Sequence, residues 1–247
     1  MEKLTNNIIM WLRKQVKDSH TKGLVVGLSG GIDSAVVTYL IKLAFPNDSL
    51  AVVMPIKSNP DDIKDASTVI KESEINSLTI DLTESHKTLY NDIYKQINNK
   101  GQWQEKKDQI NDANLRARLR MSTLYSVATN YEYLVVGTEN LAEWYTGYFT
   151  KYGDGGVDIQ PLMDLTKGEV KDLAKHLGVT KDIIDKVPSA DLWEGQTDEI
   201  EMGTSYDMID AYLKEESIPK KDKQLIENMH EKTNHKRHIA KQYRFKK

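Results

Sequence analysis

The sequence contains no cysteine, no long apolar run and no excess of basic residues. The absence of cysteine excludes a disulfide framework, a cysteine-rich zinc site and any thiol chemistry in this polypeptide. No apolar run approaches the ~20 residues of a membrane-spanning helix. The N-terminal segment also lacks the apolar region and cleavage site of a signal peptide. We therefore expect a cytoplasmic protein that does not enter a membrane.

The charge balance argues against nucleic acid as a partner. The formal net charge is −3 and the isoelectric point is near 6.1, so no overall positive field attracts a polyanion. The chain has 247 residues, which suits one α/β domain with a core of its own. No internal repeat or clear domain boundary is visible. We expect a single domain over 1–247.

A glycine-rich segment is the strongest local signal. It reads Gly27, Leu28, Ser29, Gly30, Gly31, Ile32, Asp33 and Ser34. It follows the apolar run 24–26 and precedes the apolar helix pattern 35–44. A glycine-rich turn between strand and helix directs backbone N–H groups at an anion. The segment is neither a Walker A loop nor the dinucleotide fingerprint. The alternative is a tight turn with a well-capped helix.

Strand and helix patterns alternate along the first half of the chain. The expected strands are 24–28, 50–54, 77–80 and 133–136. The expected helices are an N-terminal amphipathic helix from Leu4 to Val16, then 33–44, 61–73, 85–97 and 111–130. This alternation predicts an α/β fold with a doubly wound parallel sheet flanked by helices, Rossmann-like in type. After Tyr145 we expect mostly loops, including a long one over 188–205, and a charged, mostly solvated C-terminal stretch.

The helix expected over 111–130 carries apolar residues on two sides. One side has Leu115 and Leu119, the other Met121 and Leu124. Such a helix is covered twice, and a second copy of the chain is the simplest second cover. Arg118 points roughly 200° away from Arg116, toward a surface where it needs an anion. An internal salt bridge is the open alternative.

Two further segments carry side chains suited to a phosphate site. Thr138 and Glu143 follow the strand 133–136, so they emerge at the same sheet edge as Asp33. Two carboxylates beside phosphates are typical magnesium ligands, although Glu143 could also be an ordinary exposed helix residue. The segment 148–158 combines aromatics, lysine, carboxylates and glycines. It suits close approach to a ligand, or it is a surface turn.

Taken together, these motifs resemble one family. The string Ser-Gly-Gly-x-Asp-Ser is similar to the pyrophosphate loop of the ATP pyrophosphatase group. The segments 114–121, 137–143, 147–156, 165–168, 188–192 and 235–237 follow it in an order that resembles ammonia-dependent NAD synthetase over nearly the whole chain. The resemblance implies a homodimer that amidates deamido-NAD to NAD with ammonia, by way of an acyl-adenylate, while ATP becomes AMP and pyrophosphate. It implies no glutaminase domain.

The resemblance also assigns residues. It implies that ATP is held by residues 27–34 with Thr138, Lys167 and Ser189, and magnesium by Asp33 and Glu143. Deamido-NAD would be held by Arg118, Lys151, Asp158, His235 and Lys236. Asp33, Glu143, Lys151 and Lys167 would offset charge in the reaction. Ser189 stands where the family usually has threonine, and the loop after Met54 is shorter than in many members.

The sequence is also compatible with two other functions. One is a tRNA-modifying ATP pyrophosphatase, which the acidic balance and the absence of cysteine argue against. The other is a non-catalytic ATP-binding module, in which Glu143, Lys151 and Lys167 would be superfluous. The sequence does not choose between Asp154 and Asp158 as the group that deprotonates ammonium. It also leaves open the metal count, the contacts of the loops 55–60 and 191–204, and the source of ammonia.

Overall fold

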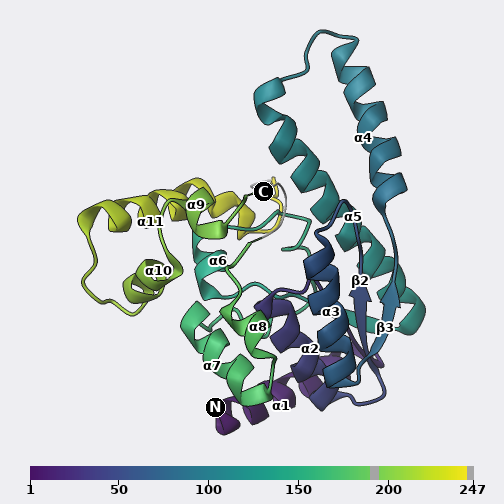
Figure 1. The fold of residues 1–247 in the computed structure, drawn as a ribbon, viewed down its shortest axis with the longest axis vertical. Helices are drawn as coiled ribbons and strands as arrows, with labels where there is room; N and C mark the ends of the chain where they lie inside the picture. The colour runs from purple at the N-terminus through teal and green to yellow at the C-terminus, as the bar shows by residue number, and fades with distance from the viewer. Residues whose placement is uncertain (190–194, 244–247) are drawn as a thin grey trace, which may run out of the picture.

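Four parallel strands form the sheet that positions the rest of the chain (Figure 1). The computed structural model describes residues 1–189 and 195–243. The strands are β1 (Gly23–Gly27), β2 (Ser49–Val53), β3 (Asn76–Thr79) and β4 (Tyr133–Val136), in the order β3-β2-β1-β4. Every pairing is parallel. The sequence prediction of a doubly wound α/β fold is confirmed.

Helices cover both faces of the sheet because β1 is apolar on both sides. Leu24 and Val26 join a core cluster with α1 (Glu2–Ser19), α2 (Ile32–Ala44), α3 (Pro60–Ser73) and α7 (Lys167–Leu177). Val25 joins a second cluster with Leu124 and Ala128 of α5 (Asp108–Tyr131) on the opposite face. The amphipathic N-terminal helix predicted from the sequence therefore packs on α2.

The strand order changes direction at β1. The chain passes from β1 to β2 on one side, and β4 lies on the other. In a doubly wound sheet this change leaves a crevice at the carboxyl ends of the two central strands, where ligands bind. The glycine loop follows β1 and the segment that carries Thr138 and Glu143 follows β4. The topology therefore places both motifs at one edge.

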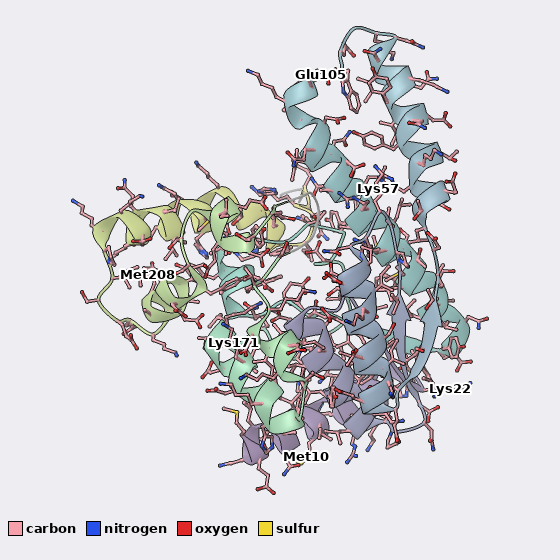
Figure 2. All side chains as sticks on the ribbon, viewed as in Figure 1. Met10, Lys22, Lys57, Glu105, Lys171 and Met208 are labelled. Carbon is pink, nitrogen blue, oxygen red and sulfur yellow. The ribbon has the colours of Figure 1, made fainter. Side chains whose placement is uncertain are left out.

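A helical arm projects from the sheet. It consists of α4 (Thr83–Asn98) and the first part of α5, which lie side by side (Figure 1). Figure 2 shows Glu105, in the short helix η1 (Glu105–Lys107), at the outer end. Trp103 packs edge-on against Tyr94, with 4.9 Å between ring centroids. This edge-on contact holds the loop that follows α4 against that helix.

The expectation of a loop-rich chain after Tyr145 is incomplete, because helices alternate with the loops there. After α6 (Leu141–Thr146), the described residues form α7, α8 (Lys181–Asp185), α9 (Asp198–Met202), α10 (Tyr206–Leu213), α11 (Lys220–Lys232) and η2 (Asn234–Lys236). Side-chain caps begin several of them, including Thr197 at α9 and Ser205 at α10. Within the charged C-terminal stretch, Ile226 is fully buried in a small cluster with Met202 and Ile209.

Helix α9 lies inside the loop expected over 188–205, of which residues 190–194 are outside the described residues. Within the part of the chain that the structure describes, no helix combines the length and the apolar character needed to cross a membrane.

Candidate active site

A cavity of about 880 Å³ opens at the carboxyl ends of β1 and β4. Its walls come from the glycine loop, the loop after β2, α5, the segment 136–157, α9 with the residues before it, and the pair His235–Lys236. Segments distant in the sequence therefore meet at the edge that the strand order predicts. The volume suits one or two nucleotide-sized molecules.

The glycine loop lines one wall with seven of its eight residues. Ser34 donates from Oγ to the Gly31 carbonyl at 2.8 Å, and the Gly31 amide donates to Ser29 Oγ at 3.2 Å. Gly30 is required by the backbone conformation and by close packing. Its φ is +92°, and a Cβ there would lie 2.4 Å from the Asp62 carbonyl oxygen. Only glycine therefore allows the loop to lie on the start of α3.

Three charged side chains from three different helices meet beside this loop. Lys167 Nζ donates to Asp33 Oδ2 at 2.6 Å and to Glu143 Oε1 at 3.2 Å. The lysine side chain is 3 % exposed, and the carboxylates are 16 % and 14 % exposed. The structure therefore brings together the three residues assigned to phosphate and metal chemistry.

Asn140 holds the two carboxylates in place. Its Nδ2 donates to Asp33 Oδ1 at 2.9 Å, and its Oδ1 accepts from the Glu143 amide at 3.1 Å. Glu143 Oε2 in turn accepts from the Asn140 amide, which completes a capping box at α6. Sequence reasoning missed Asn140, although an asparagine three residues before a glutamate at a helix start is a recognisable cap.

The electrostatics of the cluster favour an additional positive charge. Burial raises the pKa of Glu143 to about 7, although Lys167 opposes the shift. Burial lowers the pKa of Lys167, but Asp33 and Glu143 outweigh it, so that the net pKa is raised and the amine stays charged. One ammonium thus faces two partly buried carboxylates, and these are hard oxygen donors suited to a divalent cation.

The other wall of the cavity carries most of the residues assigned to the second substrate. Arg118, Lys151, His235 and Lys236 line it. Lys236 Nζ donates to the carbonyls of Gly147 and Phe149, at 2.8 and 2.6 Å. Lys151 Nζ donates to the His235 carbonyl at 2.5 Å. These lysines fasten the C-terminal residues to the loop after α6.

Arg118 is exposed, and its Nη2 donates to the Lys151 carbonyl at 3.3 Å. Among the described residues it forms no ion pair, so the alternative of an internal salt bridge is not supported there. The neighbouring Arg116 is the buried arginine, with its Nη2 2.8 Å from Asp112 Oδ2.

Asp158 does not join these residues in the described chain. Its Oδ2 accepts from the Val135 amide at 2.8 Å, and its Oδ1 accepts from the Tyr125 hydroxyl at 2.9 Å. The carboxylate therefore ties the chain to β4 and α5 and does not line the cavity. The assignment of Asp158 to deamido-NAD finds no support in the geometry of this single chain.

The remaining residues assigned to ATP line the first wall. Thr138 lies two residues after the end of β4. Ser189 lines the same cavity and donates from Oγ to the Gln196 carbonyl at 2.9 Å. The serine that stands in place of the family's usual threonine therefore still brings a hydroxyl to the site.

Two further acidic residues, Asp154 and Glu139, line the cavity. Asp154 lines it, as one of the two groups considered for proton transfer, and burial raises its pKa. Glu139 was missed. It is 3 % exposed and lines the cavity, and its Oε2 accepts from Gln160 at 3.1 Å. Burial raises the pKa of Glu139 well above its ordinary value. Its place just after β4 was the available signal.

Comparison with known proteins gives a consistent result. The family model described as NAD synthase matches residues 4–240. The NH(3)-dependent NAD(+) synthetase of Alkaliphilus oremlandii is 54 % identical over 237 residues, which cover 96 % of this chain and 95 % of that protein.

Solved structures agree in fold over almost the whole chain. The NMN synthetase of Francisella tularensis superposes with a TM-score of 0.90 at 36 % identity, covering 99 % of this chain and 98 % of that one. The NH3-dependent NAD synthetase of Campylobacter jejuni gives a TM-score of 0.78 at 28 % identity, with 98 % of each chain covered. Because the family model matches residues 4–240 and a relative of nearly equal length is 54 % identical, the chain belongs to the NAD synthase family.

Proposed function

We propose that this protein amidates deamido-NAD to NAD with ammonia and splits ATP to AMP and pyrophosphate. One observation carries the proposal. Asp33, Glu143 and Lys167 converge beside a glycine loop suited to phosphates, and the opposite wall of the same cavity presents Arg118 and Lys151. A polyphosphate and a second anionic substrate can therefore meet in one cavity. The tRNA-modifying alternative is not favoured, since curated relatives that are 42–54 % identical to this chain are NH(3)-dependent NAD(+) synthetases.

The chemistry requires activation of a carboxylate, because its oxygen is a poor leaving group. Attack of the carboxylate on the α-phosphorus of ATP forms an acyl-adenylate and releases pyrophosphate. Ammonia then attacks the carbonyl and AMP departs. No protein nucleophile is needed, so the residues act by positioning and by charge. The amides of the glycine loop and the ammonium of Lys167 would hold the phosphates during the first step.

Magnesium fits the oxygen donors at this site. Asp33 and Glu143 would hold it, and it would offset negative charge on the phosphates of ATP. Among the described residues no group of three or more acidic, histidine or cysteine side chains is arranged for a metal. Phosphate oxygens and water would therefore supply the other ligands. Glu143 must be deprotonated for this role, so metal affinity should rise as the pH increases through about 7.

Ammonium must lose a proton before it can attack. Of the two carboxylates considered, Asp154 lines the cavity and Asp158 is engaged by Val135 and Tyr125. Asp154 is therefore the better-placed proton acceptor. The pKa of Asp154 is raised by burial, which makes it a stronger base than an exposed aspartate.

A mononucleotide is the second candidate for the amidated substrate. The solved structure with a TM-score of 0.90 is an NMN synthetase. Deamido-NMN carries the same nicotinate carboxylate and lacks the adenylate half of deamido-NAD. The activation chemistry at Asp33, Glu143 and Lys167 would be unchanged, so only competition between the two substrates separates the candidates.

The direct test incubates the purified chain with ATP, magnesium and ammonium, together with deamido-NAD or deamido-NMN. We expect NAD and AMP to form in equal amounts, a larger kcat/KM for deamido-NAD, and loss of activity when EDTA removes the metal. Glutamine alone should not replace ammonium, because the usual glutaminases need a cysteine nucleophile and this chain has none. ADP as the product, or no turnover with either acid, would contradict the proposal.

Replacing Asp33 by asparagine should leave the fold intact and remove most turnover. The amide has the same shape but no charge to hold a metal beside phosphate. We expect kcat to fall about a hundredfold or more. The matched control is Asp61→Asn, at an exposed position in the first turn of α3, which should keep the wild-type rate. Near wild-type kcat of Asp33→Asn at saturating magnesium would remove Asp33 from this role.

We propose that the protein is a cytoplasmic homodimer and that the arm formed by α4 and α5 lies at the interface. The arm exposes Leu89, Tyr94 and Ile97 of α4, at 41 %, 38 % and 36 %. The second apolar side of α5 was expected to contact another copy of the chain. That expectation is not supported, because Met121 on this side lines the cavity. The exposed arm residues now motivate the dimer.

Sedimentation at micromolar concentration should therefore show a dimer. Ile97→Glu should shift the equilibrium toward monomer, whereas Leu43→Glu, at a 46 % exposed position on α2, should not. A wild-type monomer that keeps full activity at nanomolar concentration would refute the dimer.

A further inference from the structure

Tyr206 lies behind the ion cluster of Lys167, Asp33 and Glu143 and has no part in the roles assigned so far. It is the first residue of α10 and is 3 % exposed. Its hydroxyl lies 3.1 Å from Glu143 Oε1 and 2.9 Å from Asp198 Oδ2. Burial raises the pKa of this phenol, so the hydroxyl stays protonated and shares its single proton between these two carboxylates. Tyr206 therefore holds the oxygen of Glu143 that also faces Lys167.

The ring of Tyr206 contacts the opposite charge of the same cluster. Lys167 Nζ lies 4.6 Å from the ring centroid, over its face. A cation in this position is attracted by the ring, most strongly where water is excluded. One side chain thus touches the carboxylate with its hydroxyl and the ammonium with its face. Its hydroxyl and its ring together therefore restrict the positions of Glu143 and Lys167.

Helix α10 also holds the backbone at Lys167. One turn after Tyr206, the carboxylate of Asp210 accepts from the amides of Lys167 and Gly168, at 3.2 and 2.8 Å. These amides belong to the first turn of α7, where a carboxylate is favourable. Tyr206 and Asp210 are four residues apart and therefore share one face of α10. This face of α10 therefore contacts both the side-chain amine and the backbone amide of Lys167.

We propose that Tyr206 is a positioning residue that sets the geometry of Glu143 and Lys167 for magnesium and ATP without touching either ligand. The inference rests on the proposed function for the roles of Glu143 and Lys167. Both of these side chains line the cavity, and Tyr206 supports them from the protein side. Asp198 at the start of α9 accepts from the same hydroxyl, so this phenol connects α9 and α10 to the ion cluster.

The test is Tyr206→Phe, which keeps the ring over Lys167 and removes the hydroxyl. The matched control is Tyr212→Phe on the same helix, whose hydroxyl lies 3.4 Å from Tyr145 and from Glu227, outside the cluster. The probe is Mn²⁺ binding to the complex of the full chain with α,β-methylene-ATP, followed by electron paramagnetic resonance. A hydrogen bond to a charged group predicts a rise in the Mn²⁺ dissociation constant of about tenfold.

In turnover assays Tyr206→Phe should lower kcat by about tenfold or more and leave the KM for ammonium unchanged. Tyr212→Phe should match the wild type in both assays. A second variant, Tyr206→Leu, also removes the ring, and it should weaken metal-free binding of the ATP analogue beyond the effect of the phenylalanine variant. Either wild-type Mn²⁺ affinity in Tyr206→Phe, or a loss fully explained by its fraction of unfolded protein, would overturn the proposal.

The Mn²⁺ measurement needs no deamido-NAD. If the wild type forms no NAD and Tyr206→Phe still weakens Mn²⁺ binding, the proposed reaction fails and the positioning role stands. If the wild type forms NAD and the variant binds Mn²⁺ normally, the positioning role alone fails.

Discussion

Burial of one ammonium between two carboxylates constrains most of this structure. Charges removed from water are tolerated only when partners compensate them closely. Lys167 therefore requires Asp33 from α2 and Glu143 from α6 to approach it, at 2.6 and 3.2 Å. The three residues lie on α2, α6 and α7, which are distant in the sequence. The ion cluster therefore constrains how these helices pack against one another. The same cluster lies beside the phosphate loop, and stability and function thus depend on one set of side chains.

Neutral side chains make the cluster rigid. Asn140 connects Asp33 to Glu143 through its amide and through a capping box. Tyr206 connects Glu143 to Lys167 from the other side. Each of these supports is almost completely buried. A catalytic geometry held in this way needs little rearrangement when ligands arrive, which is the main requirement of a reaction without a protein nucleophile.

The sequence predicted the parts of the site that depend on local order. The glycine loop lies between a strand and a helix, and parallel strands bring Asp33 and Glu143 to one edge. Lys167 and Ser189 came only from the family resemblance, because their positions depend on how later helices pack. Tyr206 and Asp210 had no sequence signal, since their roles arise where α10 meets α7. The helices after Tyr145 were missed because many charged residues obscure their short apolar patterns, as at Ile226.

The most direct measurement is a double-mutant cycle between Lys167 and Glu143, made with Lys167→Met, Glu143→Gln and the double variant. The quantity measured is the free energy of unfolding of the ligand-free protein. If the buried ion cluster organises the site, the two substitutions should be strongly coupled, by roughly 1–3 kcal/mol, and the double variant should be more stable than the sum of the single effects implies. Additive effects, within about 0.5 kcal/mol, would show that the two residues do not depend on each other and would contradict this view of the structure.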